Sequence, residues 1–135
     1  MAKADHFTCS VVTPERVVVD CDAKFLAFPA HDGERGVLPN HAPLLCKMGI
    51  GRLRIETPSE RHTLFVDGGF AQIVDNRVTL LSEQARRPAE IDPQAAAKAL
   101  DDARSMKITD AASFDRRHKA IQRARAQIRI ARSSG

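Results

Sequence analysis

Apolar and polar residues alternate along the first two thirds of the chain, which is the pattern of half-buried β-strands. Every second position is apolar in residues 7–11 and 17–21, and leucine and isoleucine alternate with arginine and glutamate in residues 52–56. Turn residues interrupt the pattern about every eight to twelve positions, as in sandwiches and barrels of short strands. We therefore predict a sandwich or barrel of short strands, with no helix, from Phe7 to about Glu83.

Clusters of turn residues divide this region into strands. Thr-Pro-Glu at 13–15 and Thr-Pro-Ser at 57–59 predict turns, and Asp75-Asn76 predicts the tight turn of a hairpin. Asp67-Gly68-Gly69 breaks the alternation, which resumes at 70–74 and ends with an apolar strand at 78–81.

Helical patterning replaces the strand pattern after residues 86–90, where alanine becomes abundant. Asp92 followed by Pro93 is typical of a helix start, and apolar residues at three- and four-residue spacing extend this first helix to Met106. Thr109 or Asp110 is expected to cap a second helix. Its predicted inward side consists of Phe114, Ile121, Ala124, Ile128 and Ala131.

The chain is therefore predicted to contain an N-terminal antiparallel β-sandwich domain, residues 1–87, and a C-terminal antiparallel two-helix hairpin, residues 88–135. The second helix would be roughly 30 Å long at about 1.5 Å per residue. Its seam is mostly alanine, and burial stabilises by only about 25 cal/mol per Å² of apolar surface. The hairpin is expected to be held weakly enough to rearrange.

Composition adds limits on the compartment. The 135 residues are 43% hydrophobic, but no apolar run approaches the roughly 18 residues of a membrane span, and the first residues lack the apolar core of a signal peptide. Three widely spaced cysteines, Cys9, Cys21 and Cys46, favour a reducing compartment over a disulfide framework. We interpret them as small core residues.

Positive charge is concentrated at the C-terminal end. The formal net charge is +4, and Asp115 is the only acidic residue after Ser113, against six arginines and one lysine. This end of the chain is expected to meet an acidic partner.

The segment from Gly33 to Leu45 reads Gly-Glu-Arg-Gly-Val-Leu-Pro-Asn-His-Ala-Pro-Leu-Leu. We predict a rigid, projecting loop, because Pro39 and Pro43 fix their own φ angles and Gly33 and Gly36 permit positive φ. The run resembles the signature loop of the epsilon subunit of F-type ATP synthases, Gly-x-x-Gly-x-x-Pro-x-His-Ala-Pro-Leu. Residues 66–70 and 76–81 are similar to that family's second segment, and the order of sandwich and hairpin matches it end to end.

The resemblance implies a non-catalytic rotor subunit of the central stalk, which couples ring rotation to ATP synthesis. Its implied partners are the gamma subunit, the rotor-ring subunits and the catalytic beta subunit. Gamma and the ring would be met by Glu34, Arg35, Leu38, Pro39 and His41. The basic second helix would meet an acidic loop of beta and hinder ATP hydrolysis, acting collectively through Arg116, Arg117, Lys119, Arg123 and Arg125.

The implied location is the cytoplasmic face of a bacterial inner membrane, bound through other subunits and not through lipid. A plastid-encoded origin and the choice between proton and sodium coupling stay open. Some family members bind ATP through an Ile/Leu-Asp-x-x-Arg-Ala motif. Here the corresponding run is Ile91-Asp92-Pro93-Gln94-Ala95-Ala96, so the isoleucine and the aspartate are present but Ala95 stands where the motif has its arginine. Nucleotide binding is therefore left open, and no cofactor is expected.

Other functions have weaker support in the residues. The five histidines and three cysteines show no metal-ligand spacing, and no nucleophile with its base or phosphate-binding loop is present. Gly33 to Gly36 matches the Gly-x-x-Gly of a nucleic-acid-binding KH loop but is flanked by strand-like residues. The alternative function is a free-standing nucleic-acid-binding module that uses the basic helix. The pI near 9.3 supports it, and the absence of Tyr and Trp for base stacking weakens it.

Overall fold

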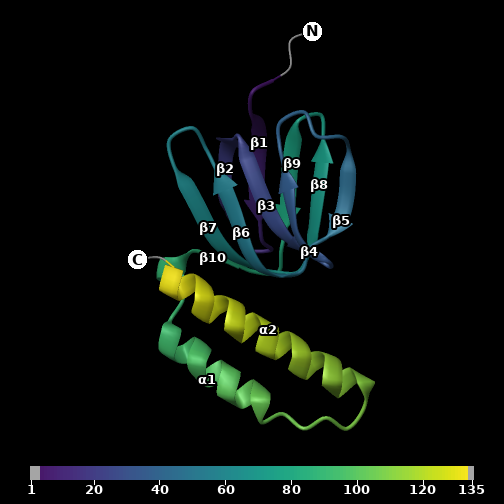
Figure 1. Ribbon diagram of the computed structural model, residues 1–135, viewed down its shortest axis with the longest axis vertical. Helices are drawn as coiled ribbons and strands as arrows, with labels where there is room; N and C mark the ends of the chain where they lie inside the picture. Colours follow the sequence, from purple (N-terminus) through teal and green to yellow (C-terminus); the bar gives the residue numbers. More distant parts are fainter. Residues whose placement is uncertain (1–3, 134–135) are drawn as a thin grey trace.

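The computed structural model describes residues 4–133, and it confirms a β-sandwich followed by two helices (Figure 1). Sheet A has, in spatial order, the strands β2 (Val17–Ala23), β1 (Phe7–Val12), β9 (Arg77–Leu81), β8 (Phe70–Val74) and β5 (Leu44–Lys47). Sheet B has the strands β10 (Ala85–Arg86), β7 (Arg61–Asp67), β6 (Ile50–Glu56), β3 (Phe25–Ala30) and β4 (Gly33–Val37). Within residues 4–133 the strand pairs are antiparallel except β1 and β9, which run parallel from Thr8 beside Arg77 to Val12 beside Leu81.

The sandwich core lies between the two sheets and contains the inward side chains predicted from the alternation. Fully buried members include Phe7, Phe28, Leu53, Ile55 and Leu80. The cysteines are also core residues, as predicted: Cys9 is fully buried, and Cys21 and Cys46 pack partly buried against the same cluster. Such burial of apolar side chains is the main stabilising contribution to the sandwich.

The predicted turns are present and follow from local chemistry. Asp75 and Asn76 both have positive φ, 50° and 61°, as a two-residue hairpin turn between antiparallel strands requires. The Thr13 amide donates to the Arg16 carbonyl at 2.9 Å, and the Thr57 amide donates to the Glu60 carbonyl at 2.9 Å.

The chain passes from sheet B to sheet A at a tight corner, Asp67-Gly68-Gly69. Gly69 has φ of 98°, and a Cβ atom there would lie 1.7 Å from the Leu81 carbonyl oxygen. Only glycine allows the backbone to approach this closely. The Met48 amide donates to the Gly69 carbonyl at 2.8 Å and holds the corner against the segment between β5 and β6.

The structure corrects one prediction about the Gly33 to Leu45 segment. Its first five residues form the edge strand β4, paired with β3, and the loop comprises only residues 38–43. Gly33 has positive φ as expected, but the positive-φ residue of the loop is Asn40 and not Gly36. A Cβ atom at Gly36 would approach the Phe25 ring at 3.3 Å, so packing explains the absence of a side chain there.

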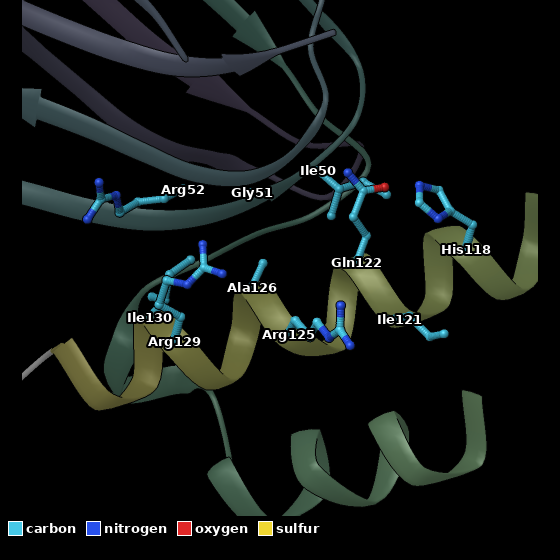
Figure 2. A pocket seen from close by; sticks show the side chains of 10 residues that line it. All are labelled: Ile50, Gly51, Arg52, His118, Ile121, Gln122, Arg125, Ala126, Arg129 and Ile130. Carbon is cyan, nitrogen blue, oxygen red and sulfur yellow. The ribbon is translucent and has the colours of Figure 1, made fainter. Parts of the chain in front are cut away.

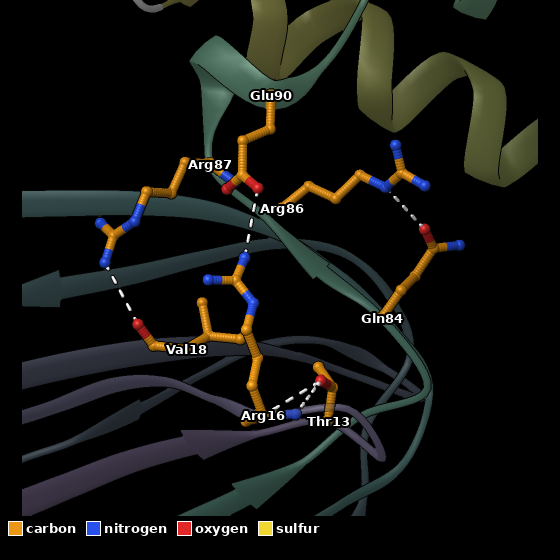
Figure 3. A network of polar contacts seen from close by, with 7 residues as sticks. All are labelled: Thr13, Arg16, Val18, Gln84, Arg86, Arg87 and Glu90. Carbon is orange, nitrogen blue, oxygen red and sulfur yellow. Dashed lines mark hydrogen bonds and ion pairs between the residues drawn. The ribbon is translucent and has the colours of Figure 1, made fainter.

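A short linker fixes the helices to the sandwich. It contains the 3₁₀ turn η1 (Pro88–Glu90), and Glu90 accepts from the Arg87 amide at 3.0 Å and pairs with Arg16 at 3.2 Å (Figure 3). The Arg87 guanidinium also donates to the Val18 carbonyl at 3.2 Å. These contacts join the linker to the start of β2.

The hairpin consists of α1 (Pro93–Arg104) and α2 (Ala111–Ser133). As predicted, Asp92 caps α1, its carboxylate accepting from the Gln94 amide at 2.9 Å, and Asp110 caps α2, accepting from the Ser113 amide at 2.8 Å. Met106 was expected inside the first helix but follows its end and is exposed.

The second helix is a middle layer, because it packs against α1 on one side and against β6, β7 and η1 on the other (Figure 1). This two-sided burial corrects the predicted inward stripe. Phe114 is 55% exposed near the start of the helix, whereas Ala126 and Ile130, which the stripe omitted, are buried.

The contact between α2 and the sandwich is a small second cluster, separate from the sandwich core. Phe65 projects from the outer face of sheet B and is fully buried against Ile91, Ala126 and Ile130. We call these four residues the docking cluster. The hairpin therefore lies on the surface of the sandwich and is not part of its interior.

Candidate partner-binding surfaces

The first candidate surface is the loop of residues 38–43, here called the distal loop. It lies at the end of the sandwich away from the helices (Figure 1). Asn40, with φ of 65°, anchors it: its amide donates to the Asn76 side-chain oxygen at 2.7 Å, and its side-chain nitrogen donates to the Ala4 carbonyl at 2.7 Å. Leu38 is 61% exposed at the base of the loop. A loop fixed in this way loses little conformational entropy when it binds a partner.

The structure separates the five predicted stalk-contact residues into two groups. Leu38, Pro39 and His41 belong to the distal loop, where His41 Nδ1 lies 2.7 Å from the Ala42 carbonyl oxygen. Glu34 and Arg35 lie instead on the edge strand β4.

Glu34 is part of a charge network on the outer face of sheet B. Its carboxylate accepts a hydrogen bond from Arg54 at 2.9 Å and lies 3.7 Å from Arg52. These three side chains are each more than one-third exposed, so the network is solvated and contributes modestly to stability. It leaves Glu34 accessible to a partner at the sheet edge.

The second candidate surface is apolar and was not predicted. Leu45, Phe70, Val74 and Leu81 project from the outer face of sheet A and are between 41% and 68% exposed. Phe70 and Leu81 are directly paired across β8 and β9. We call these four residues the apolar face. Large side chains gathered on one sheet face, away from the helices, are typical of a protein interface.

A signal for this surface was present in the sequence. Leu44-Leu45 and Leu80-Leu81 place apolar residues on consecutive positions, so that both faces of β5 and β9 carry one. Continuous apolar strands are expected where both faces of a sheet are covered.

The third candidate surface is the basic side of α2, where the structure gives the five predicted residues different surroundings. Arg116 and Arg125 are exposed. Arg117 donates to the Arg104 carbonyl at 3.3 Å, and Lys119 pairs with Asp115 at 3.2 Å. Arg123 instead contacts the sandwich, its Nε donating to Asp67 at 2.6 Å.

A cleft of about 320 Å³ lies between α2 and β6 (Figure 2). His118 and Gln122 point from α2 toward the sheet, and Arg52 projects from the strand. Arg125 and Arg129 also line the cleft, and no carboxylate residue does. Its electrostatic character favours an anionic group.

The two residues of the incomplete nucleotide motif have structural roles. Ile91 is buried in the docking cluster, and the Asp92 carboxylate caps α1. The start of α2 is capped similarly. Hydrogen bonds from the Ser113 backbone and side chain lower the pKa of Asp110 below its ordinary value of 3.8.

No group of three or more His, Cys, Asp and Glu side chains among residues 4–133 is arranged to hold a metal ion. No helix in the described part of the chain is both long and apolar enough to span a membrane.

Comparisons with known proteins agree with this architecture. The family model for the ATP synthase Delta/Epsilon chain, beta-sandwich domain, matches residues 6–88. An ATP synthase epsilon chain from Nitratidesulfovibrio vulgaris (strain DP4) is 39% identical over 132 residues, which cover 96% of this chain and 97% of that protein. An ATP synthase epsilon chain from Rhodopirellula baltica is 40% identical, over 92% of this chain and 97% of the relative.

Among solved structures, a chain of the Euglena gracilis mitochondrial ATP synthase, determined with OSCP, F1 and the c-ring in rotational state 1, has the same fold. The TM-score is 0.83 at 22% identity, over 93% of this chain and 81% of that one.

Proposed function

The chain belongs to the family of ATP synthase epsilon chains, and from that membership we propose that it couples rotation of an ion-driven ring to ATP synthesis as a non-catalytic central-stalk subunit. The observation that carries the proposal is the match to epsilon chains over nearly the full length of both chains. In a bacterium such a subunit would lie at the cytoplasmic face of the inner membrane, bound through its partner subunits.

We propose that the apolar face binds the central shaft, formed by the gamma subunit. Leu45, Phe70, Val74 and Leu81 are each more than 40% exposed, and a subunit that transmits torque needs a contact that stays closed during rotation. Covering these side chains would remove apolar surface from water at about 25 cal/mol per Å². The hairpin leaves this face open because α2 packs against sheet B.

The distal loop would contact the polar loops of the ring. Asn40 and Asn76 fix its backbone, so Leu38, Pro39 and His41 are presented in one arrangement. Glu34 and Arg35, on β4, would extend the contact along the sheet edge.

The helical hairpin would restrain ATP hydrolysis by binding an acidic loop of the catalytic beta subunit. One exposed ion pair contributes about 0 to 1 kcal/mol, so the contact needs several cations acting together. Arg116, Arg117, Lys119 and Arg125 are accessible to such a partner in the docked hairpin, whereas Arg123 is paired with Asp67. Nucleotide binding is not part of the proposal, because Ile91 and Asp92 already serve the docking cluster and the cap of α1.

The proposal is tested by deleting residues 91–135 in the reconstituted ATP synthase. The truncated chain should still join the complex, because the apolar face and the distal loop remain, and ATP hydrolysis should rise. Because truncation uncovers Phe65, a truncated chain that also carries Phe65→Ser serves as a matched control for nonspecific association. A truncated chain that fails to join the complex would contradict this division of labour.

Charge reversal tests whether the inhibitory contact is distributed. Reversing Arg116, Arg117, Lys119 and Arg125 together should relieve inhibition more than any single reversal. Arg123 is left unchanged here, since its loss would also disturb docking. An equal effect from one reversal alone would argue against a distributed contact. A separate binding assay tests the nucleic-acid alternative, which nanomolar, sequence-selective binding of nucleic acid by the free chain would favour.

A further inference from the structure

One ion pair holds the second helix to the sandwich. Arg123 Nε donates to Asp67 Oδ2 at 2.6 Å, and a terminal guanidinium nitrogen donates to Oδ1 at 3.4 Å, so both carboxylate oxygens are engaged. The Asp67 side chain is only 14% exposed, and that of Arg123 is 36% exposed. Among the ion pairs formed within residues 4–133, this is the only one between α2 and the sandwich.

The carboxylate of this pair is positioned by the sandwich itself. Gln84 donates a side-chain hydrogen bond to Asp67 Oδ2 at 3.0 Å, and the Asp67 amide donates to the Ser82 hydroxyl at 3.0 Å. Asp67 also begins the corner at which Gly69 passes close to the neighbouring strand. The acceptor is therefore preorganised, and only the guanidinium moves when the helix leaves.

The apolar part of the docking contact is small. From α2 the docking cluster contains one alanine, Ala126, and one isoleucine, Ile130, packed against Phe65 and Ile91, and only Ile50 and Ala131 add partly buried apolar contacts around it. A partly buried, bidentate ion pair can therefore change the equilibrium between docked and released hairpin substantially.

We propose that the Asp67–Arg123 pair is a latch that holds the hairpin on the sandwich and keeps Arg123 from any other carboxylate. The same guanidinium cannot engage Asp67 and an acidic partner loop at once, so Asp67 is an internal competitor for the partner. The docking part of this proposal concerns the isolated chain. The regulatory part rests on the proposed function, because it requires that the released hairpin restrain hydrolysis.

The latch is tested in the full-length chain by thiol labelling. Ala126→Cys introduces a thiol into the docking cluster, and its labelling rate, followed peptide by peptide with mass spectrometry, reports how often the cluster opens. Adding Asp67→Asn or Arg123→Gln should each raise this rate about tenfold, since each removes a charge-assisted hydrogen bond. Arg116→Gln is the matched control: it removes the same charge from an exposed position of the same helix, seven residues before Arg123, and should leave the rate unchanged.

Two further comparisons keep the result specific. The native thiol of Cys9, fully buried in the sandwich core, should stay unlabelled in every variant and so reports that the sandwich is folded. Asp67→Asn combined with Arg123→Gln should label no faster than either single variant, because both remove the same interaction. Equal labelling in the latch variants and the Arg116→Gln control overturns the latch, as does additivity of the two latch substitutions.

Hydrolysis by the reconstituted complex separates this inference from the proposed function. Asp67→Asn should deepen inhibition, because it releases the hairpin with all its cations intact, whereas Arg123→Gln should deepen it less. If labelling responds as expected but deletion of residues 91–135 leaves hydrolysis unchanged, the inhibitory function is wrong and the latch stands. If deletion raises hydrolysis but labelling is unaffected by Asp67→Asn, the latch is wrong and the function stands.

Discussion

Replacing Phe65 with alanine should detach the hairpin and leave the sandwich folded. Phe65 is fully buried, but its neighbours are Ile91, Ala126 and Ile130 and not the residues between the sheets. Phe28 provides the matched comparison, because it is equally buried on β3 of the same sheet but belongs to the sandwich core.

The two substitutions have the same intrinsic cost and different consequences. Truncating a packed phenylalanine to alanine costs about 3–5 kcal/mol. At Phe65 most of that cost falls on docking, and about 3 kcal/mol raises the opening equilibrium roughly hundredfold, at about 1.4 kcal/mol for each factor of ten. At Phe28 the same cost falls on the folding of the sandwich. At about 4 °C per kcal/mol, this loss of stability lowers the melting temperature by roughly 12–20 °C.

Two measurements distinguish these outcomes. Labelling of the thiol introduced by Ala126→Cys reports docking, and hydrogen exchange of the amides in β8 and β9 reports the sandwich. Phe65→Ala should accelerate labelling strongly and change exchange in β8 and β9 little, whereas Phe28→Ala should accelerate that exchange. If Phe65→Ala weakens β8 and β9 as much as Phe28→Ala does, the docking cluster is part of the folding core and the reasoning is refuted.

Two other predictions concern backbone and helix ends. Gly69→Ala should prevent stable folding, since its Cβ would overlap the Leu81 carbonyl oxygen. Gly68→Ala, at a position with φ of 66° and open space around it, should cost only about 1–3 kcal/mol of stability. Equal soluble yields and melting temperatures of the two variants would contradict the corner geometry. Asp110 has a lowered pKa, so its contribution to the first turn of α2 is present above about pH 4 and is lost as pH falls below 3.8 through the lowered value. Protection of the Ser113 amide, measured as its exchange rate relative to the intrinsic rate at the same pH, should therefore fall in acid. Asp110→Asn should flatten this pH dependence of protection. A pH dependence that is unchanged by this substitution would assign the effect to another group.

The sequence was sufficient wherever the decisive chemistry is local. Alternation of apolar residues predicted the strands because each strand buries one face, and Asp75-Asn76 predicted its hairpin turn because both residues tolerate positive φ. The start of α1 was predicted correctly because Asp92 and Pro93 act within one turn of the helix.

Prediction was wrong where a distant neighbour decides the outcome. The glycines at 33 and 36 indicated a loop, but pairing with β3 makes that segment a strand, and the Phe25 ring explains Gly36. Phe114 was expected inside the hairpin, but the apolar residues of α2 are divided between two neighbouring layers, and this residue, near the start of the helix, is 55% exposed.

The candidate surfaces show the same limit. Arg123 could not be distinguished from the other arginines of α2, because its carboxylate partner lies 56 positions away in the chain. Spatial grouping of Leu45, Phe70, Val74 and Leu81 likewise depends on the order of β5, β8 and β9 in sheet A.

The outermost position of α1 has a consequence for how far the C-terminal arm extends. Its buried residues, Ala96 and Ala103, are covered within the hairpin, and Figure 1 shows α1 on the far side of α2 from the sandwich. A 12-residue helix is marginal in water without a neighbour, so departure of α2 alone would melt it. These residues measure about 18 Å as a helix and up to about 40 Å when extended. Unwinding α1 would therefore add about 20 Å to the reach of α2 from the sandwich, because a rigid helical connection would become a flexible linker.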